Sequence, residues 1–377
     1  MSAEETMIAV EEFAAGFREE PGYLDYGRVG PLSASVLAEA TGQNEILAKG
    51  RFGSVEGMRR EDQRVREAVA TLTGFDAEQV VFQPNTSTGL MQAMFGMTGG
   101  VLLSAGEFPS VTFAAVRASQ ALHVVTPTWL ETDHGRVTPG QIREQITQGT
   151  AAVAVSLVDS RTGYLTDIDG IRQVIGDRLL IVDAIQGFGV VDAPFEVADV
   201  VVGGGQKWVR AGWGTGFLAL SERALDHLTP VFSGFTGADV TESWDTVVDP
   251  SQTAKAFSVS NPDFIAQARF SAGLEEIAAV GVPAINAAIS DRVESVLDLA
   301  DDFAIPVGSS RSADERAGIV VLEPQPEQMT VLAASLFNHG ITATGRGQSI
   351  RLSIHAGTGD ETLEMLRAAF TSYASAY

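Results

Sequence analysis

The chain contains no cysteine, and this absence excludes disulfides, thiolate metal sites and every mechanism that needs a protein thiol. Lysine is almost as scarce: the 377 residues include only Lys49, Lys207 and Lys255, so arginine carries nearly all of the positive charge. A reaction that needs a lysine amine therefore has three candidates in this protein.

Basic residues are outnumbered by acidic ones, 25 against 48, which gives a formal net charge of −23. A field of this sign repels phosphate backbones and anionic membrane surfaces. No uniform apolar run approaches the ~20 residues of a membrane helix, and the acidic N-terminus lacks the basic and then apolar pattern of a secretory signal. We expect a globular cytoplasmic protein that binds neither nucleic acid nor membrane.

Histidine is also rare, and the five residues are scattered without the spacing of metal ligands. They are His123, His134, His227, His339 and His355. We therefore predict no metal site. His355 follows Arg351 by four residues, and whether it approaches a substrate is left open.

Short apolar runs alternate with helix-like segments along the first 205 residues. The runs lie at 79–83, 99–105, 122–127, 151–158, 179–184 and 197–205. Continuous Val, Ile and Leu runs of this length are typical of strands buried on both faces of a parallel sheet. The sequence therefore predicts an α/β fold with a mostly parallel central sheet.

The character of the chain changes after 259–270, where helical segments mix with a few scattered strands. This mixture is typical of a smaller α+β unit. We expect an N-terminal arm at 1–20, a large cofactor-binding domain at 21–255 and a small C-terminal domain at 256–377.

Two charged residues follow predicted neighbouring strands: Asp183 closes "LLIVD", and Lys207 comes just after "VADVVVGGG". Ligands of parallel sheets collect beyond the carboxyl ends of the strands. An acid and a lysine there suit pyridoxal phosphate (PLP), because lysine forms a Schiff base with its aldehyde and a carboxylate keeps its pyridine nitrogen protonated. The glycine motifs around Lys207 match neither a P-loop nor a dinucleotide fingerprint.

A phosphate cradle is predicted in "FQPNTSTGLMQAMFGM", where a strand end leads through "NTST" into a helix N-terminus. Ser87 and Thr88 are the expected hydroxyl donors, with Thr86 beside them. The alternative is a plain helix N-cap, which Ser, Thr and Asn serve equally well.

Seven motifs in order resemble the class V aminotransferase family of fold-type I PLP enzymes. They are "NTSTGL", "GEFPS", "SLVDSRTGYLTDI", "IVDAIQGFG", "VGGGQKWVRAGWGTGFL", "FSVSNP" and "IRLSIHAGTGDE". The family includes cysteine desulfurases, selenocysteine lyases, kynureninases and isopenicillin N epimerases, and the resemblance runs from about position 23 to the C-terminus. It implies a PLP-dependent enzyme with a large parallel-sheet domain and a small α+β domain.

The resemblance also assigns cofactor roles. Lys207 matches the Schiff-base lysine, Asp183 the partner of the pyridine nitrogen, and Gln186 the residue that contacts the phenolic oxygen. Phe108 falls where the family stacks an aromatic ring or a histidine on the pyridine face. Gln206 stands where many members have a phosphate-binding histidine.

Two further matches concern the partner subunit and the substrate. Asn261 corresponds to a residue that reaches the neighbouring subunit's phosphate, which implies a homodimer with a shared active site. Arg351 matches the arginine that binds the substrate α-carboxylate, a role for which its planar fork is suited.

The reaction is less defined than the cofactor. Persulfide-forming desulfurases need a cysteine that this chain lacks. "FPS" at 108–110, "TGYLTD" at 162–167 and "VSNP" at 259–262 look closest to kynureninases, and Phe235 falls where those enzymes carry a tryptophan. Against this, Gln206 replaces a kynureninase tyrosine, and the chain is shorter than theirs.

The hypotheses that remain are a kynureninase-like or related lyase, which cleaves a carbon–carbon or carbon–heteroatom bond of an amino acid, and an aminotransferase that yields a keto acid. In both, Lys207 moves the α-proton. A non-enzymatic protein with this fold is disfavoured because the lysine, aspartate and arginine are all present.

Overall fold

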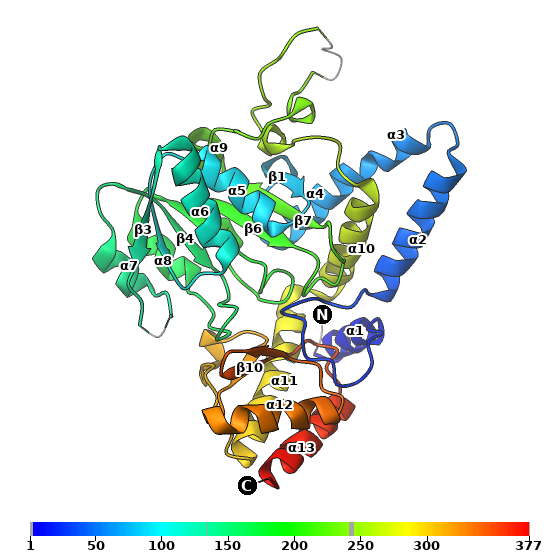
Figure 1. Ribbon diagram of the computed structural model, residues 1–377. Helices are drawn as coiled ribbons and strands as arrows, with labels where there is room; N and C mark the ends of the chain where they lie inside the picture. The colour runs from blue at the N-terminus through cyan, green and yellow to red at the C-terminus, as the bar shows by residue number, and fades with distance from the viewer. Residues whose placement is uncertain (1–2, 134, 241–244, 377) are drawn as a thin grey trace.

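The structure is a computed structural model, and it describes residues 3–133, 135–240 and 245–376 (Figure 1). Its larger part is built on a sheet of seven strands in the order β1-β7-β6-β5-β4-β2-β3. The strands are β1 Val80–Gln83, β2 Gly99–Ser104, β3 Val125–Leu130, β4 Thr150–Ser156, β5 Leu179–Asp183, β6 Val200–Gly204 and β7 Gly216–Leu220.

Neighbours from β3 through β2, β4 and β5 to β6 are parallel, whereas β7 runs antiparallel to both β6 and β1. The predicted α/β fold with a mostly parallel sheet is confirmed. The carboxyl ends of β1, β2, β4, β5 and β6 consequently share one edge of the sheet. Ligands of such sheets bind at this edge.

The strand predictions differ from the structure in two places. The run at 122–127 was expected to be a strand, but β3 begins at Val125 because α6 (Pro109–Leu122) continues to Leu122 and ends at His123, whose φ is 58°. The antiparallel β7 was not predicted. Its five residues follow "GWGT", and their apolar run is short.

Helices cover both faces of the sheet, and the strands are buried on both sides. Adjacent residues of β4 show this, because Val153 belongs to one hydrophobic cluster and Ala154 to the other. One face carries α5, α6 and α9, while α7 and α8 lie over the other (Figure 1). These helices are α5 Thr86–Gly96, α7 Pro139–Gln145, α8 Ile168–Ile175 and α9 Glu222–His227.

A helical layer connects the N-terminal part of the chain to the sheet. Its helices are α1 Ala3–Ala15, α2 Ala34–Lys49, α3 Ser54–Met58, α4 Arg60–Thr73 and the long α10 Phe264–Val280. α4 presents Val65 and Val69 to the core and ends at Gly74, whose φ is 75°. α10 packs against α4 and α2, and α2 and α3 project from the molecule as an arm (Figure 1).

The C-terminal part contains a second, three-stranded antiparallel sheet in the order β8-β10-β9. Its strands are β8 Ile319–Leu322, β9 Thr344–Arg346 and β10 Ser349–Ser353, and its helices are α11 Val282–Asp302, α12 Met329–Asn338 and α13 Asp360–Ala374. This mixture agrees with the predicted α+β character. The boundaries 1–20, 21–255 and 256–377 remain a prediction, and α10, placed in the last of them, packs on α2 and α4.

Residues 23–30 connect the two sheets. Tyr23 and Asp25 form parallel bridges with Thr342 and Ser353 of the C-terminal part. A few residues later, the Gly30 amide donates to the Gln206 carbonyl at 2.8 Å, beside Lys207. The N-terminal segment therefore contacts both the small sheet and the turn that carries the predicted Schiff-base lysine.

Among the described residues, no single helix is both long and apolar enough to cross a membrane. α10 and α11 meet those criteria only as a pair bent by 82°.

Candidate active site

Lys207 lies on a tight turn directly after β6. The turn is held by backbone hydrogen bonds from Gly205 to Thr215, from Arg210 to Lys207 and from Ala211 to Gly205, at 3.0, 3.0 and 2.7 Å. Arg210 adopts a φ of 59°. Its guanidinium lies over the Phe17 ring, 3.4 Å from the ring centroid, so the chain just after α1 packs against the turn.

The amine of Lys207 is nearly enclosed, since only 9% of the residue is exposed. Its Nζ lies 5.4 Å from the centroid of the Phe108 ring. Burial lowers the pKa of Lys207 to about 8; Asp183 opposes this shift, while Arg351 and Arg346 add to it. A lysine with this pKa is partly a neutral amine near neutral pH, the form that attacks a carbonyl.

Asp183 ends β5 and is 2% exposed. One carboxylate oxygen, Oδ1, accepts from the Ile185 amide at 3.1 Å, whereas Oδ2 is buried and has no hydrogen-bond partner among the described residues. Burial raises the pKa of Asp183 to about 6, against the Ile185 hydrogen bond and the charge of Lys207. An unpaired buried carboxylate oxygen is costly, and a protonated ring nitrogen would satisfy it.

The N-terminus of α5 forms the predicted phosphate end of the site, but its hydroxyl groups differ in role. Asn85 caps the helix and accepts from both the amide and the hydroxyl of Thr88, at 2.9 and 3.1 Å. The Ser87 hydroxyl lies 2.7 Å from that of Ser110. Thr88 thus contributes to a helix N-cap, which was the alternative to the phosphate cradle.

Thr86 and Gln206 carry the free polar atoms at this end. Thr86 Oγ1 and Gln206 Oε1 are buried without a hydrogen-bond partner in the described part of the chain. A Cβ built on Gly204 would lie 3.0 Å from Thr86 Oγ1 and 2.6 Å from Gln206 Oε1, so both atoms border the space that this glycine leaves open. The structure favours Thr86 over Thr88 as the hydroxyl donor to a phosphate.

Gln186 is hydrogen-bonded to the segment at 23–30 and to the residue that follows Lys207. Its Nε2 donates to the Gly27 carbonyl at 2.9 Å, and its Oε1 accepts from Trp208 Nε1 at 2.9 Å. A glutamine amide has two N–H donors, so one remains for the phenolic oxygen contact that the resemblance implies. That contact stays a prediction.

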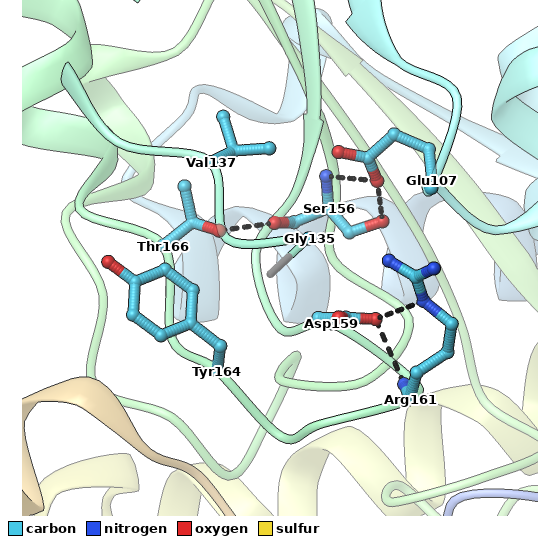
Figure 2. A pocket seen from close by; sticks show the side chains of 9 residues that line it. Glu107, Gly135, Val137, Ser156, Asp159, Arg161, Tyr164 and Thr166 are labelled. Atoms are coloured by element: carbon cyan, nitrogen blue, oxygen red, sulfur yellow. Dashed lines mark hydrogen bonds and ion pairs between the residues drawn. The ribbon is translucent and has the colours of Figure 1, made fainter. Parts of the chain in front are cut away.

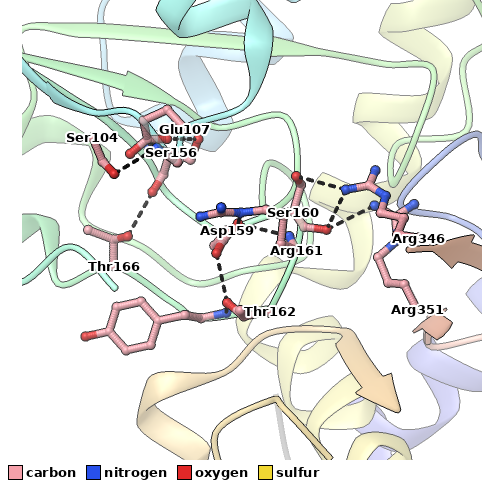
Figure 3. A network of polar contacts seen from close by, with 12 residues as sticks. Ser104, Glu107, Ser156, Asp159, Ser160, Arg161, Thr162, Thr166, Arg346 and Arg351 are labelled. Atoms are coloured by element: carbon pink, nitrogen blue, oxygen red, sulfur yellow. Dashed lines mark hydrogen bonds and ion pairs between the residues drawn. The ribbon is translucent and has the colours of Figure 1, made fainter. Parts of the chain in front are cut away.

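Arg351 lies on β10 and is 1% exposed, so it is not a surface arginine. Its Nη1 donates to the Ser160 carbonyl at 3.2 Å, and its Nη2 pairs with Asp25 at 3.4 Å. Figure 3 shows Arg346 reaching the same serine. Sequence reasoning missed Asp25, Ser160 and Arg346, which come from three distant segments.

A small cavity lies beside Glu107, which directly precedes the predicted stacking residue Phe108 in the chain (Figure 2). It has a volume of about 10 Å³, room for one water. Glu107 lines it and accepts from the Ser156 amide at 3.0 Å and from the Ser156 hydroxyl. Burial raises the pKa of Glu107 to about 7 against these bonds, and nothing in the sequence singled out this acid.

Two predicted residues do not meet Lys207 within one chain. Phe235 lies on η3 (Phe235–Gly237) and is 70% exposed. Nearby Phe232 packs on Phe95, near the C-terminus of α5 and away from the N-terminus that faces the site. Asn261 is exposed in the loop before α10, so its predicted role depends on a partner subunit.

His355 is a core residue, which answers the question that the sequence left open. It is fully buried, its Nε2 lies 2.9 Å from the Trp208 carbonyl, and its Nδ1 accepts from the Ala356 amide at 2.8 Å. Burial lowers the pKa of His355 to about 3. His134 lies outside the described residues, and no group of three His, Asp or Glu within the described ranges could hold a metal ion.

Comparison with known proteins settles the family. The family model for aminotransferase class-V matches residues 56–376. The chain belongs to the aminotransferase class-V family. This confirms the resemblance and the expected cofactor, because class V enzymes use PLP, and Asp183 Oδ2, Thr86 Oγ1 and Lys207 are groups of the kind that PLP requires.

Curated relatives of this class V protein are named probable cysteine desulfurases. The one from Methanothermobacter thermautotrophicus is 25% identical over 265 residues, which cover 64% of each chain and thus just under two thirds of that relative's length. The one from Pyrococcus abyssi is 22% identical over 287 residues, covering 73% of this chain and 71% of the relative.

Solved structures share the fold. The apo cysteine desulfurase from Thermococcus onnurineus NA1 superposes with a TM-score of 0.83 at 20% identity over 95% of both chains. The cystine C–S lyase C-DES, in complex with its reaction product cysteine persulfide, gives 0.84 at 18% identity over 93% of this chain and 97% of its own. None of these four proteins is named a kynureninase, so they do not support that part of the prediction.

Proposed function

We propose that this class V protein is a PLP-dependent lyase that cleaves a carbon–heteroatom bond at the β carbon of an α-amino acid. The observation that carries the proposal is the buried pair of Asp183 and Lys207 at adjacent strand ends. Asp183 has a free oxygen, Oδ2, and the pKa of Lys207 is held at about 8 by burial.

When bound, PLP supplies an electron sink for charge that develops at the substrate α carbon. Asp183 would keep its ring nitrogen protonated, and Phe108 would cover one face of the ring. Thr86, the side-chain N–H donors of Gln206 and the α5 N-terminus would hold the phosphate. Arg351 would bind the substrate α-carboxylate through its two-pronged guanidinium.

Lys207 would then have two tasks. With PLP bound, its amine would be the group that holds the cofactor as a Schiff base, and a substrate amine would take its place. Once freed, the Lys207 amine would accept the proton from the substrate α carbon, and the ammonium so formed would donate a proton to the group that leaves the β carbon. Burial of the amine favours this exchange, because it keeps the pKa of Lys207 near neutrality.

The nature of the leaving group follows from the relatives and from the missing cysteine. Two relatives are named cysteine desulfurases, and one structural neighbour is a cystine C–S lyase. This chain has no thiol to receive sulfur, whereas elimination across the α and β carbons needs none. These points favour carbon–sulfur or similar carbon–heteroatom cleavage over kynureninase-like carbon–carbon cleavage.

A homodimer is part of the proposal. The arm formed by α2 and α3 exposes Leu37, Ile46, Leu47, Phe52 and Val55, and the segment before α10 exposes Phe235 and Val247. Phe52 and Val247 are completely exposed, at 109% and 104%. A second copy would bury such side chains and would bring Asn261 to a neighbouring phosphate. A solution mass of one 39.8 kDa chain would contradict it.

The cytoplasmic location and the lack of nucleic-acid and membrane partners remain predictions. The expected lack of nucleic-acid and membrane partners is supported by the net charge of −23, which repels anionic polymers and anionic lipid surfaces.

The Schiff base is tested by replacing lysines in the PLP-loaded protein. We expect Lys207→Ala to abolish the visible absorbance band and the borohydride-reducible adduct found by peptide mass spectrometry. Lys49→Ala is the matched control, because Lys49 is 59% exposed on α2. A reducible adduct that persists in Lys207→Ala would show that another group holds the cofactor.

The reaction class is tested on the wild-type protein with amino acids that carry a β leaving group. A lyase releases keto acid, ammonia and the leaving fragment in equal amounts and keeps its visible band through many turnovers. An aminotransferase instead yields a keto acid without ammonia and loses the band as the cofactor takes up the amine. The second result would replace the lyase with the class V aminotransferase alternative.

A further inference from the structure

Positive charge is concentrated on one side of the proposed active site, although the protein as a whole carries a net charge of −23. Arg28, Arg346 and Arg351 gather around Asp25 and Ser160. The pKa of Arg351 is lowered by burial and then by the charge of Arg346, and Arg28 adds to the effect. Three guanidinium groups that repel one another need a counter-charge.

Asp25 supplies only part of that charge. It pairs with Arg351 at 3.4 Å and lies 4.0 Å from Arg28, while the Thr344 hydroxyl donates to it at 2.5 Å. No carboxylate lies within ion-pair distance of Arg346 among the described residues. One acid therefore serves two arginines and leaves the third without an ionic partner.

Arg346 ends β9, so the hairpin between β9 and β10 holds it next to Arg351. Its Nη1 donates to the Ser160 carbonyl at 3.3 Å and to the Ser160 hydroxyl at 3.4 Å. Arg351 Nη1 donates to the same carbonyl at 3.2 Å (Figure 3). Both recorded bonds of Arg346 use Nη1 alone, which leaves the donors on Nη2 and Nε for a ligand.

Arg346 and Arg351 both act electrostatically on the reacting amine. Arg346 and Arg351 both lower the pKa of Lys207 through their charge, so both lie within electrostatic reach of the same Nζ. If Arg351 binds the α-carboxylate of a substrate, Arg346, which donates to the same Ser160 carbonyl as Arg351, is available to another group of that substrate. An uncharged side chain would leave this guanidinium unpaired.

We propose that Arg346 is a specificity-determining residue that binds a second acidic group, so that the preferred substrates are amino acids with an anionic side chain. The inference rests on the proposed function, because it takes Arg351 as the α-carboxylate site. Arg28, whose side chain is 75% exposed, adds positive charge beside Asp25. The negative charge of such a substrate would then balance the positive charge of the three arginines.

The test compares acids with their uncharged amides, which have nearly the same shape. L-aspartate against L-asparagine and L-glutamate against L-glutamine are titrated into the PLP-loaded wild-type protein, with binding followed by visible absorbance and by calorimetry. We expect at least one acid to bind roughly tenfold or more tightly than its amide, since charge-assisted bidentate bonds are the strong ones.

Three variants then locate the effect. Arg346→Gln should remove the preference for the acid and leave the affinity for the amide within about twofold, while Arg346→Lys should keep part of it because the charge remains. Arg311→Gln is the control, since Arg311 pairs with Asp301 elsewhere in the C-terminal part. Thermal unfolding of each variant reports whether it is folded.

Two results would overturn the inference. One is equal affinity of the wild type for an acid and its amide. The other is an equal loss of affinity for both ligands in Arg346→Gln, which would mean that Arg346 only holds Ser160 in place. These failures are distinguishable from failure of the proposed function. If Lys207 holds no Schiff base, Lys207→Ala leaves the visible band in place; if the reaction is not elimination, products change while the acid preference remains.

Discussion

Gly30 and Lys207 are in contact through their backbones. A Cβ built on Gly30 would lie only 1.9 Å from the Lys207 carbonyl oxygen, and the Gly30 amide donates to the adjacent Gln206 carbonyl at 2.8 Å. The position of the lysine turn thus depends on a residue 177 positions earlier in the chain having no side chain.

Gly30→Ala should therefore displace the turn. A 1.9 Å approach to backbone cannot be relieved by a side-chain rotation, so we expect a loss of about 3 kcal/mol or more in the free energy of unfolding together with loss of bound PLP. Chemical denaturation and cofactor absorbance measure both effects.

Gly42→Ala is the matched control for that variant. Gly42 lies inside α2, and no atom comes within 4 Å of a Cβ placed there. Alanine should stabilise the protein by about 0.5–1 kcal/mol without changing PLP content. Equal behaviour of the two alanine variants would mean that the Gly30 contact does not hold the turn.

Thr86 and Thr88 differ in what their hydroxyls do, although both lie in the first turn of α5. Thr86→Ala should raise the dissociation constant for PLP roughly tenfold, because it removes a free donor from the phosphate end. Thr88→Ala should chiefly weaken the Asn85 cap and cost about 1 kcal/mol of stability. Equilibrium dialysis of PLP and thermal unfolding separate the two, and the reverse ranking would restore Thr88 as the phosphate ligand.

The buried Asp183 should give the apoprotein a characteristic dependence on pH. Its folded-state pKa is raised from 3.8 to about 6, so the folded state binds this proton more tightly than the unfolded state does. Stability from this group is therefore present below about pH 4 and lost as pH rises through 6, to an extent of about 3 kcal/mol.

Asp183→Asn should remove that slope. The apoprotein variant should be more stable than the wild type at pH 8 and similar to it near pH 4, as followed by thermal unfolding. Its PLP-loaded form should lose activity by roughly 10²-fold or more, because an amide cannot hold the ring nitrogen charged. An unchanged pH dependence in the variant would show that Asp183 is not the titrating group.

The sequence was sufficient for the parallel strands, apart from the bounds of β3, and for residues whose chemistry is local to a motif. Asp183 and Lys207 could be found because each follows an apolar run that ends at the same edge of the sheet. β7 was missed, because its run of five residues follows a glycine-rich loop and pairs in the opposite direction.

Other parts of the site could not be read from the sequence. Arg346, Ser160 and Asp25 meet only because a hairpin, a loop after β4 and the N-terminal segment converge, and sequence separations of 186 and 326 residues hide this. The choice between Thr86 and Thr88 depends on how Asn85 orients the first turn of α5. That orientation is set by packing and not by the order of the hydroxyl residues.

The segment at 23–30 links the small C-terminal sheet to the turn that carries Lys207. One end pairs with β10 and the strand-like residue Thr342 of the C-terminal part, and the other is hydrogen-bonded to the lysine turn through Gly30. A rigid-body rotation of the small sheet would therefore displace this turn. If Arg351 binds a substrate carboxylate, as proposed, that event and the placement of the Lys207 amine are joined by eight residues of chain.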